Sequence, residues 1–258
     1  MALLVVASGK GGVTKTTTAY ALAAALREFE EQPVLLDLDP GGSLTENAGL
    51  IADGRHALDL LEGLGEIEHF AATTPDGLAL IPGTGDLLGA GASHEHQVRW
   101  ADRLRTIARD HLVIVDTAQG LGLAATRAAL LAADYIVVPM QAEPAVIKRS
   151  YPDVLALLRF FRGDPALRER FPLNPSLLFI LTKYNGRLGL TRHELEKLAR
   201  EGVQVAAYVP NGVAAAEACL SGRSVITYAP HSPVAEGYRA LARTVLATMN
   251  AQKVAVEH

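Results

Sequence analysis

The ten residues from Ser8 to Thr17 constrain this chain more than any other segment, because they read Ser-Gly-Lys-Gly-Gly-Val-Thr-Lys-Thr-Thr. Five apolar residues, Leu3–Ala7, precede them, and a helix-forming run, Ala19–Phe29, follows. A strand, a glycine-rich loop and a helix in that order form the frame of a phosphate-binding loop. The backbone N–H groups of such a loop surround phosphates, and the positive end of the helix faces them. The segment therefore predicts a nucleotide phosphate site.

Side chains within the loop indicate the chemistry of this site. Lys15 would reach the β- and γ-phosphates of a nucleoside triphosphate, and the Thr16 hydroxyl would bind Mg²⁺. Thr14 stands where the plain motif has glycine, although a β-branched residue disfavours positive φ angles. A second lysine, Lys10, stands at the start of the loop, where it can point out of its own pocket. The residues expected to contact the phosphates are Gly11, Gly12, Val13, Thr14, Lys15, Thr16 and Thr17.

Carboxylates stand at the ends of two other predicted strands. Asp37 and Asp39 are two residues apart where the Val34–Leu38 strand ends, so their side chains point to the same side. Facing a phosphate loop, such a pair can bind Mg²⁺ through water and orient the attacking water. Asp116 follows the apolar run Leu112–Val115, as the carboxylate of a Walker B strand does. The predicted metal site is made by Thr16, Asp37 and Asp116.

Apolar β-type runs alternate with helical stretches along the chain. Several runs are apolar throughout, as strands buried on both faces are. The alternation predicts an α/β fold, with a mostly parallel, twisted sheet that has helices on both faces. Ligands of such sheets lie at the carboxyl ends of the strands, where the loops described above should converge. The predicted strands are Leu3–Ala7, Val34–Leu38, Leu78–Ile81, Leu112–Val115, Tyr135–Val138, Leu177–Leu181 and Val203–Tyr208. The helices predicted after the first are Val98–Ala108, Lys148–Phe161, Arg192–Arg200, Ala214–Leu220 and Val234–Met249, and Gly83–Ala92 is expected to be a loop.

Composition limits the class of protein. A length of 258 residues with 49% hydrophobic residues suits one large α/β domain or two small ones. Since no linker is visible, we expect a single domain over 1–250, followed by a disordered C-terminal tail over 251–258. The net charge of −4 argues against a protein that is basic all over, so any nucleic-acid contact needs a local patch of Arg and Lys. Cys219 is the only cysteine, which excludes an intrachain disulfide and favours the cytoplasm. No apolar run approaches the roughly 20 residues of a membrane span.

The loop resembles a known family at every fixed position. Lys-Gly-Gly-x-x-Lys-Thr-Thr, here Lys10–Thr17, is the signature of the deviant Walker A ATPases of the ParA/MinD class, and Thr14 falls on a variable position. The resemblance continues through Gln141–Pro144, Leu181–Asn185 and Tyr208–Asn211 to the last helix. It is closest to the small ParA/Soj-like proteins that lack an N-terminal DNA-reading domain. It implies a deviant P-loop NTPase fold and slow hydrolysis of ATP with Mg²⁺ as cofactor.

The resemblance also implies roles for the residues near the phosphates. Asp39 matches the residue that positions the hydrolytic water, and Asp37 matches the one nearer the metal. Gly41 stands where the family usually has glutamine. After Asp116 the family usually continues with Thr-Pro-Pro, whereas this chain has Thr-Ala-Gln-Gly at 117–120.

Three positions in the second half of the chain match the family's contacts with the base. Thr182 lies in the segment that resembles the strand end beside the base. Pro210 and Asn211 belong to the segment that resembles the loop closing over the adenine. The resemblance therefore implies that these residues help to bind ATP.

The resemblance also implies a homodimer that forms around ATP. In this family two ATP-bound protomers face each other, and the signature lysine, here Lys10, crosses to the phosphates of the partner. A cation there offsets the charge that builds on the γ-phosphoryl group in the transition state. Lys10, Lys15 and Asp39 are therefore the expected catalytic residues, and the dimer should separate after hydrolysis.

The resemblance also implies that the ATP-bound dimer binds double-stranded DNA without sequence preference, and that a ParB-like centromere-binding protein stimulates hydrolysis. Such DNA binding neutralises phosphates and depends steeply on salt. Arg187 falls where Soj-like proteins carry a DNA-contacting arginine, whereas Ala214 stands where a second one is expected. Arg223 is the other arginine expected to contact DNA here. The implied function is segregation of plasmid or chromosome DNA by a cytoplasmic, nucleoid-associated protein.

Two other functions stay open. A ParA-like ATPase can position a protein cargo, and sequence does not separate this from DNA partition because the ATPase is shared. A MinD-like ATPase acts at a membrane, but Asn250–His258 lacks a basic amphipathic pattern, so no membrane partner is expected.

His94 and His96 are too few for a zinc site and are expected in a solvated loop. A nitrogenase-reductase-like electron carrier is excluded, because its cluster needs several cysteine ligands.

Overall fold

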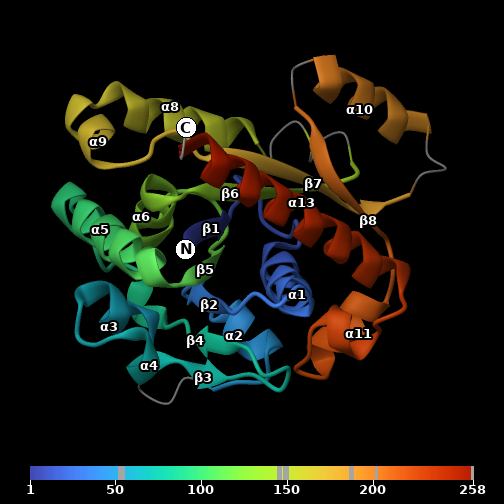
Figure 1. Cartoon of the computed structure of the whole chain (residues 1–258), viewed down its shortest axis with the longest axis horizontal. Coiled ribbons are helices and arrows are strands. Elements are labelled where there is room, and N and C mark those ends of the chain that lie inside the picture. Colours follow the sequence, from blue (N-terminus) through green and yellow to red (C-terminus); the bar gives the residue numbers. More distant parts are fainter. Residues whose placement is uncertain (52–55, 144–146, 148–150, 186–188, 201–202, 257–258) are drawn as a thin grey trace.

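A computed structural model describes residues 1–51, 56–143, 147, 151–185, 189–200 and 203–256 of the chain. Within these residues, eight strands form one sheet in the order β3-β4-β2-β5-β1-β6-β7-β8 (Figure 1). Neighbouring strands are parallel except for the antiparallel pair β3 and β4. The strands are β1 (Ala2–Val6), β2 (Pro33–Leu38), β3 (Ala72–Thr73), β4 (Ala79–Ile81), β5 (Leu112–Thr117), β6 (Tyr135–Gln141), β7 (Ser176–Tyr184) and β8 (Val205–Pro210).

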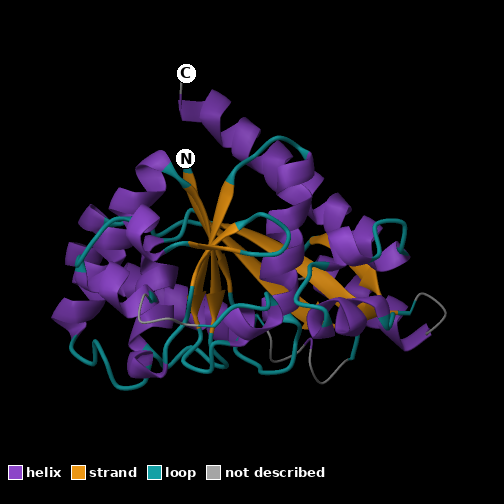
Figure 2. Ribbon diagram, turned by 90° about the horizontal axis from the view of Figure 1, so that it is seen from below, coloured by secondary structure: helices purple, strands orange, loops and turns teal. Residues whose placement is uncertain are grey.

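Helices cover both faces of this sheet, which is seen between them in Figure 2. The core on one face includes side chains of α1, α11, α12 and α13, and the core on the other includes side chains of α3 to α6 and α8 to α10. The helices are α1 (Lys15–Glu28), α2 (Ser43–Asn47), α3 (Ala57–Glu62), α4 (Ile67–Phe70), α5 (His94–Asp110), α6 (Ala124–Ala132), α8 (Pro152–Gly163), α9 (Pro165–Arg170), α10 (Gly189–Arg200), α11 (Ala214–Leu220), α12 (Val225–Tyr228) and α13 (Pro233–Val256), with a short 3₁₀ turn at Gly85–Leu87.

Strand β1 shows why the central strands are apolar throughout. Leu3 and Val5 belong to the core on one face of the sheet, and Leu4 and Val6 belong to the core on the other. Successive side chains of a strand point to opposite faces, so a sheet covered on both faces needs an apolar residue at each position. This packing holds the end of β1, and with it the glycine-rich loop, in the middle of the sheet.

The predicted α/β fold with a mostly parallel sheet is confirmed, and the differences lie at element ends and in short elements. Helix α5 begins at His94, so His94 and His96 lie in its first turn and not in a loop. The reason is a cap, because the Ser93 hydroxyl accepts a hydrogen bond from the backbone N–H of His96 at 3.2 Å. The helix predicted over Lys148–Phe161 is observed from Pro152, and positions 148–150 lie outside the described residues.

The C-terminal segment also differs from the prediction of a disordered tail. Helix α13 continues as far as Val256, and positions 257–258 lie outside the described residues. Gln252 ties this last part to the sheet: its amide oxygen accepts a hydrogen bond from the Tyr135 hydroxyl, and its amide nitrogen donates to Ser176 Oγ at 2.7 Å. Among the described helices, none has both the length and the apolar character needed to cross a lipid bilayer.

Candidate active site

The glycine-rich loop connects the C-terminal end of β1 to the N-terminal end of α1. Gly12 and Thr14 have φ angles of 72° and 70°, so the loop does require the left-handed conformation that glycine favours. In Thr14 this conformation stores roughly 1–2 kcal/mol of strain. Thr14 is the N-cap residue of α1, yet its side chain caps no backbone N–H. The first N–H groups of α1 are therefore left for an anion, as a phosphate site needs.

A cavity of about 470 Å³ is lined by this loop and by residues that follow β2 and β5. Lys15 lies at its wall and is 8% exposed. Burial lowers the pKa of the Lys15 ammonium group, and the carboxylates of Asp116 and Asp39 oppose that decrease. A buried cation beside uncapped N–H groups suits a polyphosphate. Of the residues predicted to contact phosphates, Gly12, Val13, Thr14, Lys15, Thr16 and Thr17 line this cavity.

Asp116 is the residue that fits a metal ion. Its side chain is fully buried at the end of β5, and neither carboxylate oxygen has a hydrogen-bond partner in the described chain. Burial raises the pKa of Asp116 well above its usual value, the Asp37 carboxylate raises it further, and the Thr16 hydroxyl partly opposes the increase. A buried carboxylate without a donor is unfavourable unless a cation balances it. Asp116 and Thr16 thus offer the oxygen ligands that Mg²⁺ prefers.

Asp37 lies opposite Asp116 on the neighbouring strand β2 and is also fully buried. Its carboxylate already accepts hydrogen bonds from the backbone N–H of Thr45 at 2.9 Å, the Thr45 hydroxyl at 2.7 Å and the backbone N–H of Asp39 at 3.0 Å. Burial nevertheless raises the pKa of Asp37 to about 6. The structure therefore gives Asp37 a role in fixing the segment after β2, and its contact with the metal stays a prediction.

Asp39 lies at the start of the loop that leads into α2. One of its carboxylate oxygens accepts the backbone N–H of Gly41 at 3.0 Å, and the other accepts the Ser43 hydroxyl at 2.9 Å. The side chain lines the cavity and lies close enough to Lys15 to raise the pKa of the ammonium group. Asp39 is thus placed beside the phosphate site, as predicted, with its carboxylate held by its own loop.

A second cavity, of about 240 Å³, adjoins the first. Thr182, Pro210 and Asn211, the residues predicted to lie near the base, all line it. They come from the ends of β7 and β8, which are neighbours in the sheet. Thr14 and Thr17 line both cavities, so a base in the second would be joined to phosphates in the first.

Lys10 is half-buried at the start of the loop and is not among the residues that line the phosphate cavity. Its backbone N–H donates to Ser8 Oγ at 3.3 Å. Lys15 and Lys10 therefore face different surroundings, because the first lies in the pocket and the second outside it. The role of Lys10 in a partner's site stays a prediction.

Long-range contacts with the loop include several that the sequence motifs did not indicate. The Gln141 amide at the end of β6 donates a hydrogen bond to the Gly12 carbonyl. A Cβ atom added to Gly9 would lie 2.3 Å from a carboxylate oxygen of Asp153, and one added to Gly11 would lie 2.2 Å from Cδ of the Gln119 side chain. A side chain at position 9 would therefore displace Asp153, and one at position 11 would displace the amide of Gln119. The alternation of strands and helices carries no signal for such pairings.

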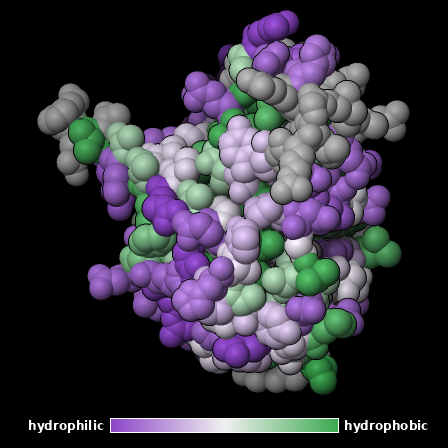
Figure 3. All heavy atoms as spheres, turned by 90° about the vertical axis from the view of Figure 1, so that its right-hand side faces the viewer, coloured by the Kyte–Doolittle hydropathy of each residue, from purple (hydrophilic) through white to green (hydrophobic). Residues whose placement is uncertain are grey.

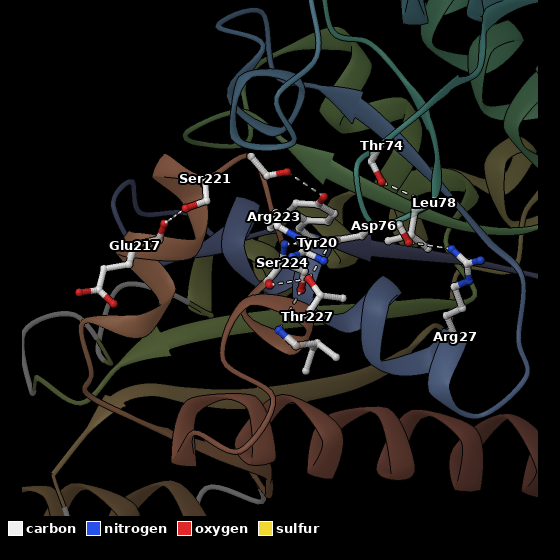
Figure 4. Close-up of polar contacts among 12 residues, drawn as sticks. Tyr20, Arg27, Thr74, Asp76, Leu78, Glu217, Ser221, Arg223, Ser224 and Thr227 are labelled. Atoms are coloured by element: carbon white, nitrogen blue, oxygen red, sulfur yellow. Dashed lines mark hydrogen bonds and ion pairs between the residues drawn. The ribbon is translucent and has the colours of Figure 1, made fainter.

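The structure describes only one of the two arginines that are predicted to contact DNA. Arg187 lies outside the described residues. Arg223 is 45% exposed, and its Nε donates to the Asp76 carboxylate at 3.1 Å, as Figure 4 shows. Asp76 also accepts the backbone N–H of Ser224 at 2.6 Å and the Thr227 hydroxyl at 2.7 Å. Arg223 is therefore anchored to the turn between β3 and β4, with part of its guanidinium group at the surface.

The surface on the side of α10, α11 and β8 is mostly hydrophilic (Figure 3). Hydrophobic residues are scattered over it and do not form one broad patch. Val213 and Leu220, at the two ends of α11, are among the exposed apolar side chains of the chain. Single exposed apolar residues of this kind are common on protein surfaces.

Comparisons with known proteins agree with this site. A family model described as an AAA domain matches residues 1–151. The chain is 36% identical to the chromosome-partitioning ATPase Soj of Thermus thermophilus over 252 residues, which cover 95% of each chain. It is 30% identical to the sporulation initiation inhibitor protein Soj of Bacillus subtilis, covering 95% of this chain and 98% of that protein.

A solved structure of a similar protein contains an ATP analogue and magnesium. The cobyrinic acid a,c-diamide synthase of Mycobacterium smegmatis, crystallised with an ATP analogue and magnesium, superposes with a TM-score of 0.74 at 25% identity. The match covers 98% of this chain and 97% of that one. A buried carboxylate, a lysine in the loop and two adjoining cavities are in place here for the same kind of ligand. The chain therefore belongs to the ParA/MinD class of P-loop ATPases, and it is an ATPase that uses ATP and Mg²⁺.

Proposed function

We propose that this ATPase partitions DNA, as the name of its relative in Thermus thermophilus suggests. ATP holds two protomers face to face, the dimer binds double-stranded DNA without sequence preference, and a ParB-like protein stimulates hydrolysis and release. The protein would then reside on the nucleoid. The observation that carries this proposal is the position of Lys10, which is half-buried in the loop but outside the phosphate cavity of its own chain.

Within each protomer, residues of the chain hold the nucleotide and the water. Mg²⁺, bound by Thr16 and Asp116, would neutralise charge on the β- and γ-phosphate oxygens. Lys15 and the first N–H groups of α1 bind the phosphates and fix their orientation. Asp39 holds the attacking water beside them. Lys10 of each protomer adds positive charge to the γ-phosphate of the other, so hydrolysis would depend on the dimer.

The DNA contact of the proposed dimer rests on local charge. A chain with net charge −4 needs a confined cationic surface to approach a polyanion. Arg223 presents part of its guanidinium group at the surface, while its bond to Asp76 fixes its direction. Arg187 is the second arginine of this proposed surface. The cargo would be attached through the ParB-like partner.

The test uses Lys10→Ala, with Lys253→Ala as the matched control because Lys253 is exposed near the end of α13. Sedimentation velocity is measured with Mg²⁺ and a non-hydrolysable ATP analogue, and nucleotide affinity is measured separately. We expect the wild type and Lys253→Ala to form dimers, and Lys10→Ala to bind the analogue but remain monomeric. A Lys10→Ala dimer of normal affinity would contradict the role in the partner's site.

A further inference from the structure

Several polar side chains on the wall of the phosphate cavity have partners within the protein. The two carboxylate oxygens of Asp39 accept hydrogen bonds from Gly41 and Ser43. The side-chain oxygen of Asn47 accepts one from the thiol of α11 at 2.6 Å, and the Thr117 hydroxyl donates to a carbonyl of β1 at 2.8 Å. These hydrogen bonds hold each of these side chains in a fixed position.

Gln119 is different. It lies in the loop after β5, three residues beyond Asp116, and its side chain lines the same cavity. Its amide makes no hydrogen bond to any residue in the described part of the chain, and the residue is exposed. The amide is thus available to a ligand in the cavity.

The phosphate loop fixes where this amide lies. A Cβ atom added to Gly11 would be 2.2 Å from Cδ of Gln119 and 2.5 Å from both its amide nitrogen and its amide oxygen. The amide group is therefore packed directly on the α-carbon of Gly11, one residue before the part of the loop that lines the cavity. This contact places the amide beside the phosphate loop before any ligand binds, which favours a positioning role.

Gly41, in the loop after β2, does not offer a comparable group, because it has no side chain and its N–H donates to Asp39. An amide can accept a hydrogen bond from water and donate one to a phosphate oxygen at the same time, which a carboxylate cannot do. A glutamine orients the attacking water in other P-loop nucleotide hydrolases.

We propose that Gln119 orients the attacking water in this ATPase, with its amide oxygen accepting a hydrogen bond from the water and its amide nitrogen donating to a γ-phosphate oxygen. The water oxygen forms a bond to the γ-phosphorus, and the bond from that phosphorus to the β–γ bridging oxygen breaks. The electron pair leaves with ADP, and the water protons pass to inorganic phosphate and solvent. Gln119 acts beside Asp39 and is not consumed. The proposal rests on the ATPase activity of the family and not on DNA binding.

The test compares Gln119→Ala, Gln119→Glu and the control Gln32→Ala, because Gln32 is exposed before β2 at the far end of the strands. Phosphate release is followed in a single turnover with Mg²⁺ and excess full-length protein, and ADP affinity is measured for each variant. We expect both Gln119 variants to slow hydrolysis by roughly tenfold to a hundredfold. ADP affinity should change by less than about twofold, since the expected loss is confined to the transition state.

Gln119→Glu keeps the shape of the side chain on Gly11 but loses the donor. A normal rate in this variant would show that packing alone matters and would overturn the proposal, as would a normal rate in Gln119→Ala. A parallel fall in rate and ADP affinity would also overturn it, because Gln119 would then be holding the loop. A wild type without ATPase activity would instead refute the activity itself.

Discussion

Individual groups of the chain can bind metal and phosphate because the fold leaves them without hydrogen-bond partners. Among the residues that the structure describes, Asp116 is buried with two unpartnered carboxylate oxygens, and the Thr14 side chain does not cap the first N–H groups of α1. Groups of this kind are unfavourable in the empty protein and favourable once a ligand of opposite charge is bound. Mg²⁺ and nucleotide should therefore stabilise the folded chain strongly, since they bind the native state.

Replacing Asp116 with Asn tests this account of the metal site. Without Mg²⁺ the variant should melt at the same temperature as the wild type or above it, because a buried carboxyl group that is costly to ionise has been removed. In the wild type, Mg²⁺ should add to the stabilisation that ADP gives, and in the variant this addition should disappear. Differential scanning fluorimetry with ADP, with and without EDTA, measures both effects.

Asp110→Asn serves as the control, because Asp110 is exposed at the end of α5. It should leave the increase produced by Mg²⁺ unchanged. An Asp116→Asn protein that still gains stability from Mg²⁺ in the presence of ADP would show that the metal is held elsewhere.

At the scale of elements, Asp76 joins parts of the chain that are far apart in sequence. It lies in the turn between β3 and β4 and is 1% exposed, and its carboxylate binds Arg223, the N–H of Ser224 and the Thr227 hydroxyl (Figure 4). Its carbonyl accepts a hydrogen bond from Arg27 of α1 at 2.8 Å. One carboxylate thus fixes the segment between α11 and α12 against the edge of the sheet.

Asp76→Ala should lower the free energy of unfolding by roughly 1–3 kcal/mol, since it leaves the buried N–H of Ser224 without an acceptor and removes the partner of Arg223. Asp110→Ala, the exposed control, should change it by at most about 0.5 kcal/mol. Urea unfolding followed by circular dichroism gives both values. Equal effects of the two substitutions would show that the Asp76 contacts contribute little to stability.

Some helices and strands could be predicted from the sequence, and others could not. Strands such as β1 and β5 could be predicted because burial on both faces demands an unbroken apolar run, and α1 because it follows a loop motif. Helices α2, α3 and α4 have only four to six residues, too few for a helical period to be visible. Helix α2 depends on bonds from Thr45 to Asp37, which no local pattern reports.

At the scale of the whole molecule, the site combines motifs that could be predicted with contacts that could not. Lys15 and Asp116 were predicted because their residue types follow a strand or a loop at fixed spacing. Gln119 and Gln141 reach the phosphate loop only through the arrangement of β5, β6 and β1 in the sheet. Their contribution follows from packing between segments, which a single sequence does not report.

For the assembled molecule, we propose that ATP creates a DNA-binding dimer. The chain has a net charge of −4 and Arg223 is held by Asp76, so bringing two protomers together should enlarge the cationic surface that faces DNA.

The most direct test is binding to random-sequence duplex DNA, measured by fluorescence anisotropy with ATP, with ADP and without nucleotide, over a salt series. The account predicts binding with ATP only, with an affinity that falls steeply as salt increases, and a shallower salt dependence for Arg223→Ala. Equal binding with ADP, or no binding in any state, would contradict it.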